Sequence, residues 1–199
     1  MNADLPLVLV SNRGPATFED GKPQRGGGGL VTALKGLVHH RDAIWVASAM
    51  TEGDIEASEA HGARSFEVEL DDVRYRVRLV ASDSEAYDRF YNVVANPMLW
   101  FIQHYLWDLS NAPDIRRHEV EAYEQGYCTV NEDLANAVLE ELEGVESAVV
   151  MLHDYHLYLA PKFIRRARPD LFLHHFVHSP WTQPDAWRVL PSDIREDIY

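Results

Sequence analysis

The 199-residue sequence has little cysteine and little positive charge. Its one cysteine, Cys128, excludes a disulfide within the chain and falls in a predicted helix, where we expect it to pack as a small core residue. Only 18 Lys and Arg stand against 32 Asp and Glu, which gives a formal net charge of -14. A surface this acidic repels polyanions, so we expect neither a nucleic acid nor a membrane as a partner.

Long apolar runs are also missing. None approaches the length that spans a membrane, and the N-terminus lacks the basic start, apolar core and small-residue cleavage site of a secretory signal. We therefore expect a cytoplasmic protein. No internal repeat or low-complexity linker divides the sequence, and 46% hydrophobic residues suffice for one well-packed domain, which we expect to span residues 1–199.

The order of the apolar segments predicts an α/β fold. Short apolar runs that alternate with segments of helical periodicity are typical of parallel strands with crossover helices. Alternating apolar and polar residues on both sides of Asp71-Asp72 add a hairpin within residues 64–80. The expected strands are residues 5–10, 43–48, 147–152 and 171–177, and the expected helices are residues 30–38, 54–61, 82–94, 116–143 and 157–167, with another after Pro184 or Pro191.

Three local features refine this pattern. The segment from Asn12 to Gly28 is rich in glycine and proline and is expected to be a loop. Ser82, with Glu85 three positions on, is expected to cap the helix that follows. Asn96-Pro97 is expected to break or kink that helix, because proline lacks the N–H that a helix interior needs.

Polar residues follow three of the expected strands at their carboxyl ends. The first strand runs into Ser11-Asn12-Arg13, the strand at 147–152 into His153-Asp154-Tyr155-His156, and the strand at 171–177 into His178-Ser179. In open α/β sheets, ligands bind beyond the carboxyl ends of the strands. If these strands are parallel neighbours, their ends meet at one rim, which is the candidate site.

The first of these strand ends lies close to a glycine run, Gly26–Gly29. The run precedes an expected helix, and backbone N–H groups at a helix N-terminus can approach a phosphate closely when no Cβ blocks them. The run fits neither a Walker A loop nor the dinucleotide fingerprint, so a flexible surface loop is the alternative. Arg13 favours phosphate binding because its guanidinium offers a bidentate fork; for this residue a surface ion pair is the alternative.

Imidazole and carboxylate groups gather at the other two strand ends, where they could serve as metal ligands. Successive side chains of a strand point to opposite faces, however, so His153 and Asp154 are not expected to bind one ion, and we expect no metal site. Asp154 is better suited to accept hydrogen bonds from substrate hydroxyls. Of His174 and His175 we expect one in the core and the other in solvent.

Five short motifs follow one another along the chain. They are Ser11-Asn12-Arg13, Gly28-Gly29-Leu30, Tyr91-Asn92 with Asn96-Pro97-Met98-Leu99-Trp100, His153-Asp154-Tyr155-His156-Leu157, and His178-Ser179-Pro180-Trp181 with Leu190-Pro191. With these motifs nearly the whole chain resembles the trehalose-6-phosphate synthase family of retaining glycosyltransferases. Segments 45–49 and 187–191 are also similar to related pseudo-glycosyltransferases that join cyclitol units.

The resemblance implies a Rossmann-like parallel-sheet domain, the N-terminal, acceptor-binding half of a two-domain glycosyltransferase of GT-B type. In that family the C-terminal domain supplies most nucleotide-sugar contacts, and we expect it to be missing from residues 1–199. The resemblance implies no cofactor. The implied partners are a nucleotide-sugar donor, UDP-glucose or GDP-glucose, and glucose 6-phosphate as acceptor, with trehalose 6-phosphate as product. Formation of a homo-oligomer is left open.

On the acceptor side, the resemblance implies roles for several residues. Arg13 and Tyr91 would bind the phosphate of glucose 6-phosphate, and Asp154 would hold the sugar hydroxyls. Trp100 and Ser179 would shape the pocket that selects the acceptor anomer. Residues 178–182 read His-Ser-Pro-Trp-Thr where the family usually has His-Ile-Pro-Phe-Pro, and Phe101 stands where proline is usual. Both departures fall on the acceptor side.

On the donor side, the resemblance implies that Gly28 and Gly29 face the diphosphate and that His178 lies beside the donor sugar. Asp154 and His178 are then the catalytic candidates. The implied mechanism is front-face transfer with retention, which needs no enzyme nucleophile and depends on positioning and electrostatics. The alternatives are transfer to another phosphorylated acceptor, of the glucosylglycerol-phosphate or validoxylamine-phosphate type, and a non-catalytic sugar-phosphate-binding domain.

Overall fold

The computed structural model describes residues 5–106 and 115–199 as an α/β fold on a mixed, mostly parallel sheet of six strands. The strands of this sheet are β1 (Leu7–Ser11), β4 (Ala43–Ser48), β5 (Phe66–Leu70), β6 (Val73–Val80), β7 (Val149–His153) and β8 (Phe172–Phe176). Their spatial order is β5-β6-β4-β1-β7-β8, and only β5 is antiparallel to its neighbour. The expected α/β fold is confirmed, and β1, β7 and β8 are adjacent parallel strands.

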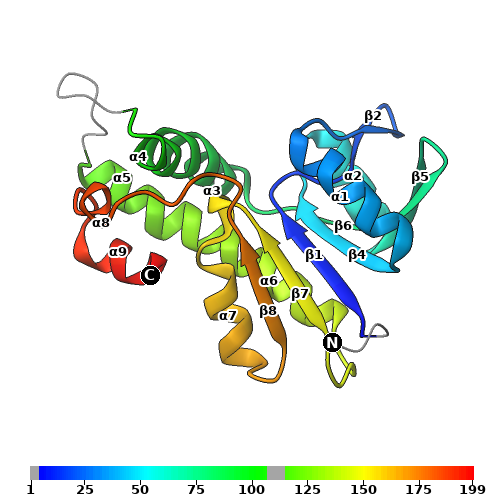
Figure 1. Cartoon of the computed structure of the whole chain (residues 1–199). Coiled ribbons are helices and arrows are strands. Elements are labelled where there is room, and N and C mark those ends of the chain that lie inside the picture. The colour runs from blue at the N-terminus through cyan, green and yellow to red at the C-terminus, as the bar shows by residue number, and fades with distance from the viewer. Residues whose placement is uncertain (1–4, 107–114) are drawn as a thin grey trace.

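Helical segments connect the strands and cover the sheet on both faces (Figure 1). They are α1 (Gly29–His40), α2 (Glu52–Ala60), α3 (Ser84–Asp88), η1 (Arg89–Trp100), α4 (Phe101–Gln103), α5 (Arg117–Ala122), η2 (Tyr123–Tyr127), α6 (Cys128–Glu141), η3 (Tyr155–Leu157), α7 (Ala160–Ala167), α8 (Pro184–Trp187) and α9 (Ser192–Ile198). The helix expected at residues 116–143 is formed by α5, η2 and α6 in succession. Both segments expected after Pro184 and Pro191 are helical.

Two hydrophobic cores lie on the two faces of the sheet. Leu7 and Leu9 of β1 belong to the core beneath α1, whereas Val8 and Val10 belong to the core beneath α6 and α7. Because both faces of β1 are covered, its sequence is a continuous apolar run rather than an alternating one. These cores fix the sheet and thereby the positions of its strand ends.

The segment expected to be a loop between Asn12 and Gly28 contains a two-stranded antiparallel hairpin, so that expectation was wrong. Its strands are β2 (Ala16–Glu19) and β3 (Lys22–Arg25), and β2 lies beside α2 (Figure 1). Asp20 and Gly21 form the turn, both with positive φ, as a tight hairpin turn requires. All of β3 is exposed, so no alternation of apolar residues marks it as a strand.

The helix that follows β6 differs from the expectation at both marked positions. Its cap is Asp83, whose carboxylate accepts from the backbone N–H groups of Glu85 and Ala86, both at 3.0 Å. Ser82 instead donates to Asp133 at 2.6 Å, so the predicted cap was wrong by one residue. Pro97 does not break the helix, because it lies in the π-type segment η1, whose wider turn makes room for the proline ring.

The helical run formed by α3, η1 and α4 and the run formed by α5, η2 and α6 are in close contact at Gly126 in η2. A Cβ atom at this position would lie 2.5 Å from the Cβ of Arg89 and 2.8 Å from the backbone nitrogen of Phe90. No side chain fits there, so the glycine permits η1 and η2 to pack backbone against backbone. This contact holds η1, and with it Tyr91, against the rest of the fold.

At one edge of the sheet, β8 pairs only with β7 in the described part of the chain. Phe172 and Phe176 on this strand are 50% and 49% exposed. His174 between them is exposed, while His175, on the opposite face, is half-buried, in line with the expected division of the two histidines. No helix formed by residues 5–106 or 115–199 is long and apolar enough to cross a membrane.

Candidate active site

A cavity of about 270 Å³ lies at the carboxyl ends of β1 and β7, beside the N-terminus of α1. Parallel strands bring these ends together, so residues that are far apart in the sequence share its wall. The site residues expected from the sequence that line this cavity are Arg13, Gly28, Gly29, Tyr91 and Asp154. The cavity therefore combines a cation, a helix N-terminus, a phenol and a carboxylate.

Arg13 and Tyr91 form a directly bonded pair on the cavity wall. The guanidinium Nη2 of Arg13 donates to the hydroxyl of Tyr91 at 3.0 Å. Burial alone would raise the pKa of Tyr91, but the hydrogen bonds from Arg13 and Asn96 outweigh it and lower this pKa. The same bond raises the pKa of Arg13, whose charge is thus retained beside the cavity. A fixed, permanently charged guanidinium next to a hydroxyl suits a phosphate.

Asp154 stands at the end of β7 with an unusual backbone conformation. Its φ of 74° and ψ of 169° fall in a region that is favourable only for glycine. Two bonds to the β8 strand hold it there: the Asp154 N–H donates to the carbonyl of Phe176 at 2.8 Å, and Nε2 of His175 donates to the Asp154 carbonyl at 2.9 Å. With this turn, Asp154 lines the cavity. The preceding residue, His153, also lines it.

The η2 and α6 segments anchor the turn that follows Asp154. The hydroxyl of Tyr127 donates to the Tyr155 carbonyl at 2.6 Å, and Nδ2 of Asn131 donates to the His156 carbonyl at 3.0 Å. Burial lowers the pKa of His156 to about 4, so its ring is neutral near pH 7. It stacks on Tyr155 with ring centroids 4.2 Å apart. These contacts give His156 a supporting role in the turn that follows Asp154.

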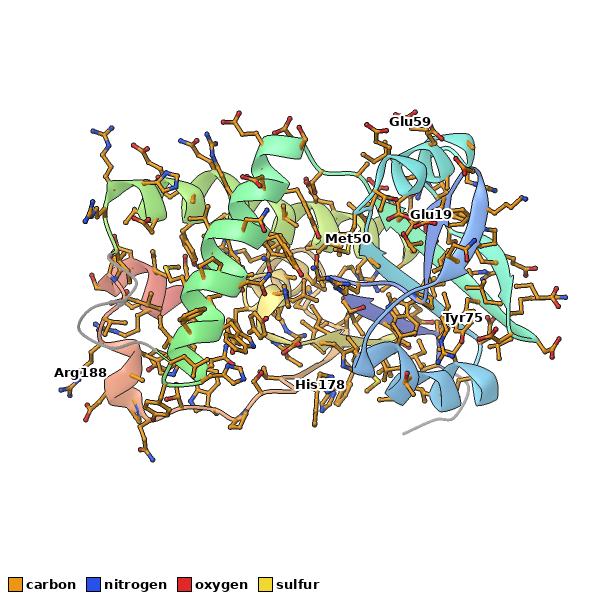
Figure 2. All side chains as sticks on the ribbon, turned by 90° about the horizontal axis from the view of Figure 1, so that it is seen from above. Glu19, Met50, Glu59, Tyr75, His178 and Arg188 are labelled. Carbon is orange, nitrogen blue, oxygen red and sulfur yellow. The ribbon has the colours of Figure 1, made fainter. Side chains whose placement is uncertain are left out.

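His153 and His178 are paired across β7 and β8. Nδ1 of His153 lies 3.2 Å from Nε2 of His178, and the ring of His178 also packs edge-on against Phe176 at 4.7 Å between centroids. Burial, and then the neighbouring His178, lowers the pKa of His153 to about 4. His153 is almost fully buried, whereas His178 is exposed and lies on the side of the molecule away from Glu59 (Figure 2).

The glycine run supplies open backbone at the start of α1. Gly28 has a φ of 125° and is the residue before the helix, and a Cβ at Gly27, Gly28 or Gly29 would meet no atom within 4 Å. Side chains of the described residues therefore leave the first N–H groups of the helix open to the cavity. Such groups can bind an anion, because the helix dipole adds partial positive charge.

Three of the expected site residues do not line this cavity. Trp100 stacks on His104 with centroids 4.3 Å apart, and His178 and Ser179 follow β8 beyond the cavity wall. Two further lining residues, Asn12 and Asn96, were not singled out as site residues, although both belong to the motifs. Asn12 precedes Arg13, and Asn96 lies in the same helical segment as Tyr91, so both could have been found from their neighbours.

Asn12 is connected to the aromatic helix as well. The Tyr87 hydroxyl donates to Oδ1 of Asn12 at 3.1 Å, and the side chain of Asn12 is almost fully buried. Among residues 5–106 and 115–199, no group of three His, Cys, Asp or Glu side chains is placed to hold a metal ion. Asn12 thus links the end of β1 to the helix that carries Tyr91.

The sequence model of glycosyltransferase family 20 matches residues 6–199. Validamine 7-phosphate valienyltransferase of Streptomyces hygroscopicus subsp. jinggangensis is 30% identical over 96% of this chain and 40% of its own length. Trehalose-6-phosphate synthase of Mycolicibacterium smegmatis is 32% identical over 93% of this chain and 34% of its own length. The chain thus spans well under half the length of these relatives.

Solved structures share the fold at lower identity. The E. coli trehalose-6-phosphate protein bound with UDP-2-fluoro glucose superposes with a TM-score of 0.67 at 23% identity, over 97% of this chain and 38% of that one. The N-terminal domain of Candida albicans trehalose-6-phosphate phosphatase gives a TM-score of 0.70 at 19% identity, over 97% and 37%. The Rossmann-like, GT-B type fold expected for this chain is confirmed.

Proposed function

Because the chain belongs to glycosyltransferase family 20, we propose that it is the acceptor-side half of a retaining transferase that moves glucose from a nucleotide sugar to glucose 6-phosphate, giving trehalose 6-phosphate. One observation carries the proposal. Arg13, Tyr91, Asp154 and the N-terminal glycines of α1 line one cavity of about 270 Å³. Its size suits a single sugar phosphate, and each of its groups has a counterpart in the proposed substrates.

In this proposal the acceptor phosphate binds Arg13 and Tyr91. The acceptor is then oriented by the Asp154 carboxylate, which accepts hydrogen bonds from its ring hydroxyls. The glycines Gly28 and Gly29 face the donor diphosphate, where the α1 N-terminus stabilises negative charge that grows as the nucleotide departs. Trp100 and Ser179 border the acceptor, and His178 lies beside the donor sugar.

The transfer step needs no nucleophile from the protein. The acceptor hydroxyl oxygen attacks the anomeric carbon on the face from which the nucleotide leaves, the bond from that carbon to the phosphate oxygen breaks, and the departing phosphate takes the hydroxyl proton. The configuration is retained. Catalysis then depends on holding both reactants in line and on stabilising the leaving phosphate. For these reactants we propose a cytoplasmic location.

Isothermal titration calorimetry of the chain with glucose 6-phosphate tests the acceptor assignment. We expect Arg13→Ala to weaken binding by about 10- to 100-fold, since a hydrogen bond to a charged group contributes about 1.5–3 kcal/mol. Arg25→Ala is the matched control, because Arg25 is exposed, pairs with Asp71 and does not line the cavity. Equal affinity of the Arg13→Ala variant and the wild-type chain would overturn the assignment.

A second candidate is transfer to another phosphorylated acceptor, and it is supported by the 30% identity to validamine 7-phosphate valienyltransferase. The departures at Phe101 and in residues 178–182 fall on the acceptor side, where such a change of substrate would act. Calorimetry with glucose 6-phosphate, glycerol 3-phosphate and a cyclitol phosphate in parallel distinguishes the acceptors by their affinities. A non-catalytic binding domain is the remaining alternative.

A further inference from the structure

The paired imidazoles of His153 and His178 carry an inference that deepens the proposed function and rests on it. One proton must lie between Nδ1 of His153 and Nε2 of His178, which are 3.2 Å apart, because two lone pairs repel and two N–H groups clash. Either ring can supply that proton. The choice decides which nitrogen of His178 remains as a donor on the exposed side of the pair.

Burial of His153 decides between the two arrangements. Its Nε2 atom is buried and has no hydrogen-bond partner among the described residues. If His178 supplied the shared proton, neutral His153 would carry its own proton on Nε2, as an unpaired buried N–H group. Unpaired buried N–H groups are rarer in proteins than under-satisfied acceptors. His178 is exposed, so water can satisfy its remaining nitrogen, Nδ1, whether that atom is protonated or not, and His178 imposes no opposing preference.

We propose that His153 is a positioning residue that donates its Nδ1–H to His178 and thereby holds His178 as the Nδ1–H tautomer, with that N–H free to donate to the sugar nucleotide. Phe176 also contacts the His178 ring, which it meets edge-on with centroids 4.7 Å apart. The ring of His178 is thus fixed both in orientation and in protonation pattern. The neutral state of buried His153 near pH 7 is consistent with this role.

The tautomer can be read directly from the nitrogen chemical shifts of the histidine rings. In the 15N-labelled wild-type chain near pH 7.5, two-bond proton–nitrogen correlation spectra are expected to show His178 protonated on Nδ1 and bare on Nε2. In His153→Leu the donor is lost, and His178 is expected to return to the Nε2–H form that free imidazole side chains prefer. In His153→Asn the amide can donate from nearly the same place, so the Nδ1–H form is expected to persist.

A merely structural role of His153 would leave the tautomer of His178 unchanged in every variant that folds. The proposal is overturned if wild-type His178 carries its proton on Nε2, or if His153→Leu keeps the Nδ1–H form. It is also overturned if His153→Asn behaves like His153→Leu. Should the leucine variant fail to fold, the wild-type spectrum still decides.

Failure of the proposed function has a different signature. A wild-type chain that binds no glucose 6-phosphate in calorimetry would overturn the acceptor assignment. That measurement depends on Arg13, Tyr91 and Asp154 and does not report the proton between the two histidines. The two experiments therefore fail separately.

Discussion

At the scale of single residues, Asp154 combines a strained backbone with a side chain that we assign to the substrate. Residues in its φ and ψ region cost about 1–3 kcal/mol unless they are glycine. The hydrogen bonds that the backbone of Asp154 makes with the Phe176 carbonyl and the His175 ring keep the turn in place. The fold is thus less stable with aspartate than with glycine at this position, and the aspartate supplies the carboxylate that we assign to the substrate hydroxyls.

This strain predicts that the variants Asp154→Gly and Asp154→Ala differ in stability, although both lose binding. Asp154→Gly is expected to be more stable than Asp154→Ala by about 1–3 kcal/mol, because only glycine adopts this conformation without strain. Both variants are expected to lose affinity for glucose 6-phosphate, since neither has a carboxylate. Urea unfolding and calorimetry of the two variants test this together. An alanine variant as stable as the glycine variant would show that the turn is unstrained.

The buried histidines predict a pH dependence of stability. The pKa values of His153 and His156 are lowered to about 4 in the folded chain, mainly by burial, against about 6.5 when unfolded. Between these values the unfolded chain binds protons that the folded chain does not. The free energy of unfolding is therefore expected to fall as the pH decreases from about 6.5 to about 4.

Urea unfolding at several pH values measures this slope. The double variant His153→Asn with His156→Gln is expected to show a smaller slope over the same window. His118→Gln is the control, because it also removes a histidine but at an exposed position. If the double variant keeps the wild-type slope, carboxylates rather than these histidines control the acid sensitivity.

At the scale of elements, one buried carboxylate attaches the β2–β3 hairpin to α2. Asp54 accepts from the N–H of Phe18 at 2.7 Å and from the hydroxyl of Thr17 at 3.0 Å, and it also accepts from the N–H of Thr51 at 3.1 Å. The hairpin joins the two halves of the cavity wall, since Arg13 precedes it and the glycine run follows it. Asp54 therefore fixes the hairpin that connects these two parts of the wall, although it does not line the cavity itself.

Asp54→Ala is expected to lower the free energy of unfolding by about 2–4 kcal/mol, because it leaves buried backbone donors unpaired. Amide hydrogen exchange in the hairpin should accelerate at the same time. Glu56→Ala is the control, because this residue of the same helix is exposed. If the amides of the hairpin exchange as slowly in Asp54→Ala as in the wild-type chain, other contacts hold β2.

Some elements of the fold can be predicted from the sequence and others cannot. Both β1 and α6 were located from their apolar residues, β1 from a continuous apolar run and α6 from helical periodicity. The hairpin was missed because every residue of β3 is exposed, although Asp20-Gly21 is a strong turn signal. A break or kink was predicted at Asn96-Pro97, but helical structure continues through Pro97, because the wider η1 segment accommodates a proline that an α-helix would not.

The candidate site was predictable as far as strand order determines it. Arg13 and Asp154 follow strands that are neighbours, so the rule for parallel sheets brings them together. The positive φ of Asp154 and the pairing of His153 with His178 depend on tertiary contacts with β8, and no spacing in the sequence encodes them.

At the scale of the whole molecule, the chain spans 34% to 40% of the relatives described above. We expect the 199-residue chain alone to bind glucose 6-phosphate but to transfer no glucose from UDP-glucose or GDP-glucose, because the proposed donor contacts lie mostly in another domain. An assay of nucleotide diphosphate release and product mass measures this. Trehalose 6-phosphate formed by the chain alone would contradict it.

Within residues 5–106 and 115–199, β8 pairs only with β7, and its phenylalanines Phe172 and Phe176 are 50% and 49% exposed. A strand edge of this kind is a template for a strand of another copy. The formal charge of -14 opposes such contact, but only over about 10 Å at 0.1 M salt, and over less as salt is added. Ionic strength therefore controls whether copies of the chain associate. We expect the chain to stay monomeric in dilute buffer and to associate through β8 at high salt concentration.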